Sequence, residues 1–259
     1  ESTRHIDWKL FGRTDKMFVK RFEEETNLRC RLILDCSSSM YFPKMNEPSF
    51  DNPNKIVFSI YAAAALMSLM KKQRDATGLS LFTDKINLHS HAKSNSVHIK
   101  YLFGELEKIL DQKLLNEDQK TDIPNSLHQI AERIHKRSLV IIFSDMFDDY
   151  DRADKLFQSL QHFRHYNHEV ILFHVVDKKL EEDLHLEDRP YKLVDMESGE
   201  QLRINPSEIR ERYAEMSAKI QHDLEMKCGR YNIDYVRADI NKGFDGIILP
   251  YLLKRKKLH

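Results

Sequence analysis

The chain has 259 residues, of which 41% are hydrophobic, enough for one large domain or two small ones with a sizeable core. Lys and Arg number 41, and Asp and Glu also number 41, so the formal net charge at pH 7 is +0. This balance gives no electrostatic reason to expect nucleic acid or an anionic membrane surface as the main partner. The basic run at 254–257 has no interleaved aromatic residues, and we expect it to be a solvated tail.

The cysteines and the apolar segments indicate the cellular compartment of the protein. Cys30, Cys36 and Cys228 form no CxxC pair, and their odd number does not fit a disulfide framework, so we expect a reducing, cytoplasmic environment. The most apolar stretch, residues 60–70, is too short to span a bilayer. The chain begins at Glu1 without a signal-peptide pattern, and we expect that an upstream segment was removed or not included.

The first half of the chain predicts two strands before its first long helix. Residues 17–22 are rich in β-formers, a polar turn follows at 23–27, and a second strand at 30–34 ends at Asp35. An alanine-rich helix is predicted over 55–72, and strands over 78–83 and 86–90. Apolar residues at helical spacing predict helices over 97–110 and 123–134.

The second half alternates strands and helices. A continuous β-branched run at 138–144 predicts a strand covered on both faces, followed by a helix at 152–166 and a strand at 169–176. A hairpin is expected at about 190–205, a long helix from 206 to about 229, and a last strand at 233–237. This alternation predicts an α/β fold: a doubly wound, mostly parallel open sheet with helices on both faces. Residues 1–27 are predicted to be an N-terminal β extension, and residues 28–259 the main domain with the hairpin inserted in it.

Two predicted strands end in a carboxylate, Asp35 on the first core strand and Asp145 after the run at 138–144. Ligands of open α/β sheets bind beyond the carboxyl ends of the strands, where the strand order reverses. If the chain winds outward in both directions, these two strands are neighbours at that point. We therefore expect Asp35 and Asp145 to share one site.

Asp35, Ser37 and Ser39 are spaced by two, so their side chains can converge as the loop leaves its strand. One carboxylate and two hydroxyls are hard oxygen donors, which suit Mg²⁺, Mn²⁺ or Ca²⁺ better than Zn²⁺. Asp145 is expected to contribute through water, and Thr121, in the loop before a predicted helix, to add a hydroxyl. Each of these residues has an alternative role as a helix cap. For Asp35 the 15 residues between Ser39 and Lys55 argue against capping.

Catalysis is the main alternative function. Asp35 could be the nucleophile of a Mg²⁺-dependent phosphatase or phosphotransferase. Such aspartyl-phosphate enzymes, of the haloacid-dehalogenase type, place a second aspartate two residues later, where this chain has Ser37. No general base stands out, and with only 7 glycines there is no glycine-rich phosphate loop. A nucleic-acid binder would depend on the basic run at 254–257 alone.

The Asp35-x-Ser37-x-Ser39 motif, with a later loop threonine and a strand-end aspartate, resembles the metal-ion-dependent adhesion site of von Willebrand factor A domains. Segments 4–9, 13–14, 19–20 and 22–25, followed by this loop, resemble the bacterial domain of unknown function family 58, which contains a von Willebrand A-like domain. The similarity runs from Arg4 to the end of the chain, and Glu1 falls inside the usual domain of the family.

The resemblance implies a non-catalytic, metal-dependent protein-binding module. Matching motif positions carry the metal site onto Asp35, Ser37, Ser39, Thr121 and Asp145, with Mg²⁺, Mn²⁺ or Ca²⁺ as the ion. A free coordination position would accept an acidic side chain from a protein partner. Members of the family are commonly encoded beside MoxR-type AAA+ ATPases, which implies an assembly or chaperone-like role with such an ATPase.

Two features depart from the von Willebrand A pattern. The glycine that usually follows the last aspartate is replaced by Met146 and Phe147, which could narrow access to the open coordination position. The connection at 41–54 is also long and could shield the site.

Overall fold

The structure is a computed structural model that describes residues 8–16, 28–83, 85–111, 123–146, 153–194, 201–244 and 246–247. Its elements, in chain order, are α1 (Trp8–Thr14), β1 (Arg29–Asp35), η2 (Ser38–Tyr41), α2 (Lys55–Gln73), β2 (Ala76–Phe82), β3 (Ile86–His89), α3 (Ser96–Asp111), α4 (Ile123–Arg133), β4 (Leu139–Ser144), α5 (Ala153–His165), β5 (Glu169–Val176), η4 (Lys178–Glu182), β6 (Tyr191–Val194), β7 (Gln201–Ile204), α6 (Pro206–Arg230), β8 (Asp234–Asp239) and η5 (Ile240–Lys242).

Six strands form the main sheet in the order β3-β2-β1-β4-β5-β8. All neighbours pair in parallel except β3, which runs antiparallel to β2 at one edge. The order reverses between β1 and β4, so the chain winds outward from the centre in both directions. This is the predicted doubly wound, mostly parallel α/β sheet, the fold of the von Willebrand A and Rossmann-like class.

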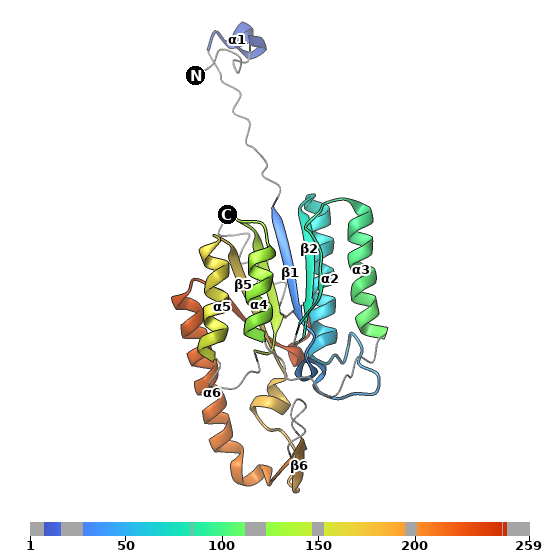
Figure 1. Cartoon of the computed structure of the whole chain (residues 1–259), viewed down its shortest axis with the longest axis vertical. Coiled ribbons are helices and arrows are strands. Elements are labelled where there is room, and N and C mark those ends of the chain that lie inside the picture. The colour runs from blue at the N-terminus through green and yellow to red at the C-terminus, as the bar shows by residue number, and fades with distance from the viewer. Residues whose placement is uncertain are drawn as a thin grey trace.

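Helices cover both faces of the sheet, as Figure 1 shows. Alternate residues of each central strand face opposite layers, since side chains along a strand point to opposite sides. Leu32 and Leu34 of β1 pack in the core under α2 and α3, whereas Ile33 packs in the core under α4 and α5. The buried Cys228 of α6 belongs to the second core, so α6 lies on the same face as α4 and α5.

Burial of both faces explains why the central strands have continuous apolar sequences. Every residue of β4 is buried, and β1 is buried throughout after its first residue. Continuous apolar runs of this kind are typical of parallel strands between two helical layers. The sheet therefore fixes its carboxyl edge rigidly, which is the edge at which the predicted site residues lie.

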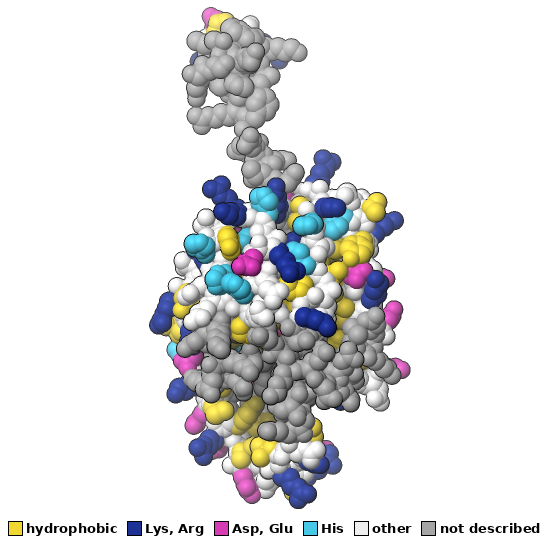
Figure 2. Space-filling model, viewed as in Figure 1, with side chains coloured by type: hydrophobic (Ala, Val, Ile, Leu, Met, Phe, Trp, Pro, Cys, Tyr) yellow, Lys and Arg dark blue, Asp and Glu magenta, His cyan; other side chains and the backbone are white. Residues whose placement is uncertain are grey.

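The predictions for the N-terminal segment and for the hairpin compare differently with the structure. Within the N-terminal β extension predicted for 1–27, the structure describes a helix, α1 at Trp8–Thr14. The strand predicted at 17–22 lies outside the described residues. The predicted hairpin is present as β6 and β7, which pair antiparallel as a separate two-stranded sheet. It projects beyond the carboxyl edge of the main sheet, where hydrophobic side chains lie beside basic ones in Figure 2.

Candidate metal centre

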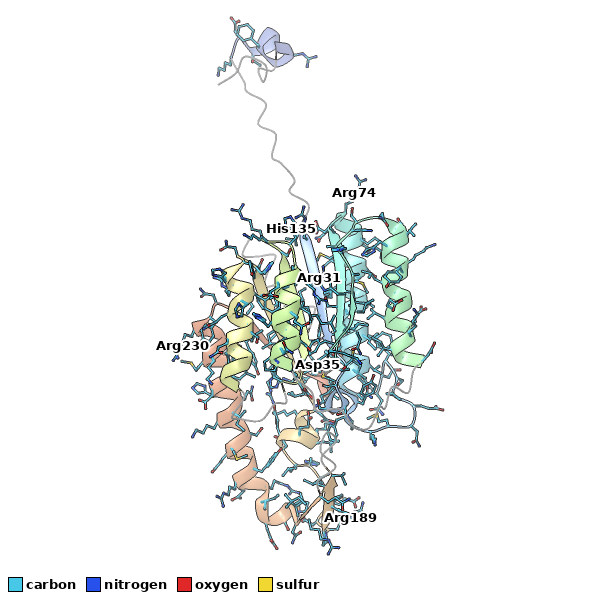
Figure 3. The ribbon with its side chains drawn as sticks, in the orientation of Figure 1. Arg31, Asp35, Arg74, His135, Arg189 and Arg230 are labelled. Carbon is cyan, nitrogen blue, oxygen red and sulfur yellow. The ribbon has the colours of Figure 1, made fainter. Side chains whose placement is uncertain are left out.

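The carboxyl ends of β1 and β4 bring Asp35 and Asp145 to the same edge of the sheet. The two strands pair in parallel, with Leu34 opposite Phe143. Asp35 is the last residue of β1, and Asp145 directly follows β4. Both side chains are buried, with 0% and 3% exposure. Figure 3 shows Asp35 at the end of β1 that faces the hairpin. The prediction that these strands are neighbours at the switch point is therefore confirmed.

The loop after β1 folds back onto the Asp35 carboxylate. Asp35 Oδ1 accepts a hydrogen bond from the backbone N–H of Ser37 at 2.9 Å, and Oδ2 accepts one from the Ser144 hydroxyl at 2.7 Å. The Ser37 and Ser39 hydroxyl oxygens lie 3.1 Å apart. The helix α2 is capped instead by Asn54, whose side chain accepts from Val57 N–H at 3.0 Å, so Asp35 does not cap that helix.

These oxygens fit a hard divalent cation. Two neighbouring ligands in an octahedral Mg²⁺ shell are about 3 Å apart, given metal–oxygen distances of roughly 2.1 Å. The separation of the two serine hydroxyls matches that value. Asp35 adds a carboxylate, and the donor set contains no soft ligand. Among the described residues no three His, Cys, Asp or Glu side chains group into a possible metal site, so a cation here would depend on the serine hydroxyls.

Asp145 is contacted directly by side chains from two other elements, α2 and β5. Its Oδ2 accepts a hydrogen bond at 2.8 Å from Nζ of Lys55, which is the first residue of α2. Lys55 Nζ also donates to Glu181 Oε1 of η4 at 2.5 Å. His174 Nε2, on β5, donates to the backbone carbonyl of Asp145 at 2.9 Å, and the Tyr235 hydroxyl lies 2.7 Å from His174 Nδ1. Asp145 is thus fixed through both its side chain and its backbone.

Burial is the main cause of the pKa shifts in the centre, and neighbouring charges are the second cause. Burial and, to a smaller extent, the nearby Asp145 carboxylate raise the pKa of Asp35 to about 7, against the hydrogen bonds from Ser37 and Ser144. Burial alone would lower the pKa of Lys55, but Asp145 and Glu181 outweigh it, so the ammonium stays charged. Desolvation lowers the pKa of His174 to about 4, which leaves the imidazole neutral. A cation beside Asp35 would favour its ionised form.

Two other predicted features of the site are Thr121 and Met146. Thr121 lies outside the described residues. Of the other predicted ligands, the structure brings together Asp35, Ser37 and Ser39, with Asp145 at the end of the adjoining strand. Met146 has a φ of 51°, in the left-handed region that glycine adopts without strain. Its side chain packs against the core under α4 and α5.

Several residues of the centre were not predicted from the sequence, namely Lys55, Ser144, His174 and Glu181. Only Lys55 carried a usable signal. It is a lysine in the first turn of a helix whose buried face is almost entirely apolar, and the helix dipole disfavours a positive charge there. The partners on β5 and η4 come from segments distant in the chain, and only the sheet order brings them to Asp145.

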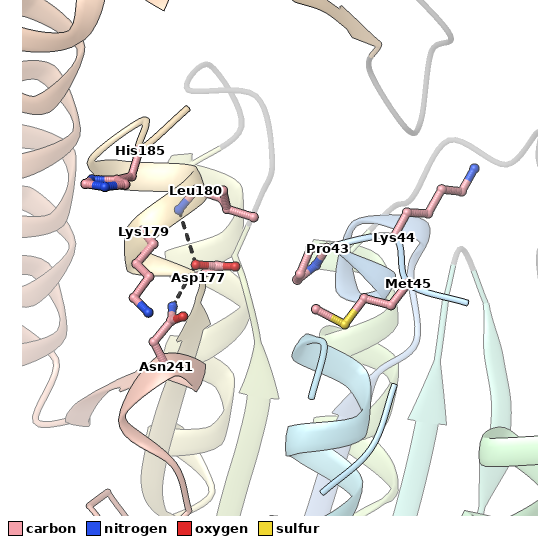
Figure 4. A pocket seen from close by; sticks show the side chains of 8 residues that line it. All are labelled: Pro43, Lys44, Met45, Asp177, Lys179, Leu180, His185 and Asn241. Carbon is pink, nitrogen blue, oxygen red and sulfur yellow. Dashed lines mark hydrogen bonds between the residues drawn. The ribbon is translucent and has the colours of Figure 1, made fainter. Parts of the chain in front are cut away.

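A cleft of about 280 Å³ opens beside the centre (Figure 4). Residues 43–45 of the long connection form one wall, and Lys179, Leu180, His185 and Asn241 form the other. At its base Asp177 accepts hydrogen bonds from Asn241 Nδ2 at 2.7 Å and Leu180 N–H at 3.2 Å. Asp177 follows β5, and Asp239 ends β8. Four parallel strands therefore each end in, or are directly followed by, a buried aspartate at this edge.

The doubly wound sheet and the Asp-x-Ser-x-Ser loop at the carboxyl end of its first core strand define a von Willebrand factor A-like domain. The model of the family described as protein of unknown function DUF58 matches residues 1–223. The chain therefore belongs to this family. No curated protein is a significant match.

Solved structures are similar to this chain at low sequence identity. BatB of Bacteroides thetaiotaomicron, described as a conserved hypothetical protein, is 13% identical with a TM-score of 0.50, over 89% of this chain and 98% of its own. An aerotolerance-related membrane protein of Bacteroides fragilis is 16% identical with a TM-score of 0.46, over 85% and 96% of the two chains. The SpRpn10 VWA domain is 14% identical with a TM-score of 0.35, over 58% and 76%. No described helix here is long and apolar enough to cross a membrane.

Proposed function

We propose that this domain is a non-catalytic protein-binding module whose binding depends on a divalent cation. Asp35, Ser37 and Ser39 would hold the ion directly, Thr121 would add a hydroxyl, and Asp145 would contribute through water. Mg²⁺ is the preferred ion, with Mn²⁺ or Ca²⁺ as substitutes, since all three take oxygen ligands. A free coordination position would accept a carboxylate from the partner.

The observation that carries this proposal is the convergence of the serine hydroxyls above a buried carboxylate. Ser37 and Ser39 are 3.1 Å apart, and the Asp35 carboxylate is 0% exposed. A buried carboxylate near a second carboxylate, Asp145, is unfavourable unless a positive charge compensates both. Lys55 supplies one positive charge through Asp145, which leaves Asp35 for the divalent ion.

The partner part of the proposal follows from the family resemblance. We propose a MoxR-type AAA+ ATPase as the partner, with an assembly or chaperone-like role. A cytoplasmic location belongs to the same proposal, and it is supported by Cys30, Cys36 and Cys228, which are buried free thiols.

A pull-down with a MoxR-type ATPase encoded beside a family member tests the partner. We expect the unmodified protein to retain the ATPase in Mg²⁺ and to lose it in chelator, and Asp35→Ala to lose it in both. Ser38→Ala is the matched control, because Ser38 lies in the same loop but its hydroxyl has no hydrogen-bond partner among the described residues. Equal retention by all three proteins, with or without Mg²⁺, would contradict the proposal.

The phosphatase alternative predicts a different result. Turnover of a generic phosphate ester that disappears in Asp35→Asn would favour an enzyme. Aspartyl-phosphate enzymes place a second aspartate two residues after the nucleophile, and this chain has Ser37 at that position. The sequence of the loop therefore favours the binding module.

A further inference from the structure

Lys55 is an unusual residue for its position. It is 0% exposed and is the first residue of α2, directly after the Asn54 cap. Lysines are almost never fully buried unless they are paired. The positive end of the helix dipole also disfavours an ammonium group in the first turn. The rest of the buried α2 face is almost entirely apolar, so packing does not explain a charged group at this position.

The contacts of Lys55 join the metal centre to a second element. Its ammonium group donates to Asp145 beyond β4 at 2.8 Å and to Glu181 of η4 at 2.5 Å. Glu181 is itself anchored, since its second oxygen accepts from Asp177 N–H at 2.7 Å. The ammonium is thus shared between a carboxylate of the proposed site and a carboxylate outside it.

We propose that Lys55 is a built-in counter-cation that sets the affinity of the centre for the divalent ion, and that Glu181 limits its effect by sharing it. This inference depends on the proposed metal binding. When all are ionised, Asp35, Asp145, Glu181 and Lys55 together carry a formal charge of −2, which one divalent ion balances. Lys55 thereby makes Asp145 a weaker attractor of the ion than an unpaired carboxylate would be.

The two partners of this pair should act in opposite directions. Lys55→Met keeps most of the length of the side chain and removes its charge, so the centre becomes more negative and the ion binds more tightly. Glu181→Gln removes the competing carboxylate, so Lys55 neutralises Asp145 more fully and the ion binds more weakly. Each variant changes the local charge by one unit, which we expect to change the Kd roughly tenfold. A merely structural role for Lys55 would weaken binding in both variants.

The test is calorimetric titration of chelator-freed protein with Mn²⁺ alone. The matched control is Glu182→Gln, the same change one residue along η4, since Glu182 pairs with Arg237 instead of Lys55. We expect a lower Kd for Lys55→Met, a higher Kd for Glu181→Gln, and an unchanged Kd for Glu182→Gln. If Lys55→Met does not fold, the difference between Glu181→Gln and Glu182→Gln decides.

The outcomes separate this inference from the proposed function. No binding of Mn²⁺ by the unmodified protein would overturn the proposed function together with the inference. Binding by the unmodified protein with weaker binding in Lys55→Met, or with equal Kd values for Glu181→Gln and Glu182→Gln, would overturn the role of Lys55 alone.

Discussion

Ser38 stands between two serines whose hydroxyls meet, yet its own hydroxyl is buried without a hydrogen-bond partner among the described residues. Ser37 is extended, whereas Ser38 and Ser39 begin the 3₁₀ helix η2, so consecutive side chains leave the loop in different directions. The motif is therefore a set of alternate residues, and the middle serine has no visible role in the centre. This difference gives three chemically identical substitutions with different expected effects.

We expect Ser37→Ala and Ser39→Ala to weaken cation binding by more than the roughly 10- to 100-fold typical of losing an outer-shell partner of a metal ligand. Ser38→Ala should leave the Kd unchanged and should not lower stability, because it removes a buried, unsatisfied hydroxyl. Titration with Mg²⁺ and chemical unfolding of the three variants check this. A similar loss of affinity in Ser38→Ala would contradict the assignment of ligands.

Asp35 predicts a pH dependence for the metal-free protein. Its pKa is raised from 3.8 to about 7 on folding, so the folded state binds the proton more tightly than the unfolded state. The free energy of unfolding should therefore fall as the pH rises between these two values, and level off above about 7. A divalent ion should offset this loss at higher pH, because it binds the ionised carboxylate.

Unfolding in urea near pH 5 and near pH 8, with chelator or with Mg²⁺, measures this effect. Asp35→Asn is the matched control, because it keeps the shape and cannot titrate. The decline in stability with pH should be smaller in Asp35→Asn than in the unmodified protein. An equal decline in both would show that another group is responsible.

At the scale of elements, the helix α2 has a capped N-terminus and a residue with a strained backbone at its C-terminus. Asn54 caps its N-terminus, and Arg74 at its C-terminus has a φ of 61° in the left-handed region. Arg74 N–H bonds to the carbonyls of Lys71 and Met70, and Asp75 N–H bonds to Met70, which is the usual arrangement at such an end. Glycine adopts this conformation without the steric cost that a side chain adds.

Arg74→Gly should raise the free energy of unfolding by ~0.5–1 kcal/mol, since the relief of strain exceeds the added freedom of the unfolded chain. The exposed Arg74 side chain contributes little, so its loss should be small. Arg74→Ala is the control, as it removes the same charge but keeps the Cβ atom. Chemical unfolding measures both. Equal stabilities of the glycine and alanine variants would mean that the left-handed conformation is not costly here.

The elements also show which parts of the fold were open to sequence reasoning. The long apolar strands β1, β4 and β5 and the helices α2 to α6 were predicted to within a few residues, because their periodicity extends over many positions. The short elements η2, η4 and η5 were not predicted. Their three to five residues carry no period, and η4 and η5 are each capped by an aspartate at the end of a strand, Asp177 and Asp239.

For the whole molecule, the centre divides into a local part and a part that depends on topology. Asp35, Ser37 and Ser39 are close in sequence, so their spacing was enough to predict their convergence. Asp145 required the strand order, which alternation of strands and helices made predictable. Lys55 and Glu181 meet only because α2 and η4 begin at the same edge of the sheet, and no pattern in the chain links them.

The most direct test of the metal centre is calorimetric titration of chelator-freed protein with Mg²⁺, comparing the unmodified protein with Asp35→Asn. We expect one ion to bind per chain to the unmodified protein and to raise its melting temperature, as ligand linkage requires. Asp35→Asn should stay folded by circular dichroism and show neither effect. Absence of binding to the unmodified protein, or equal binding to Asp35→Asn, would contradict the assignment of a cation to the Asp35 loop.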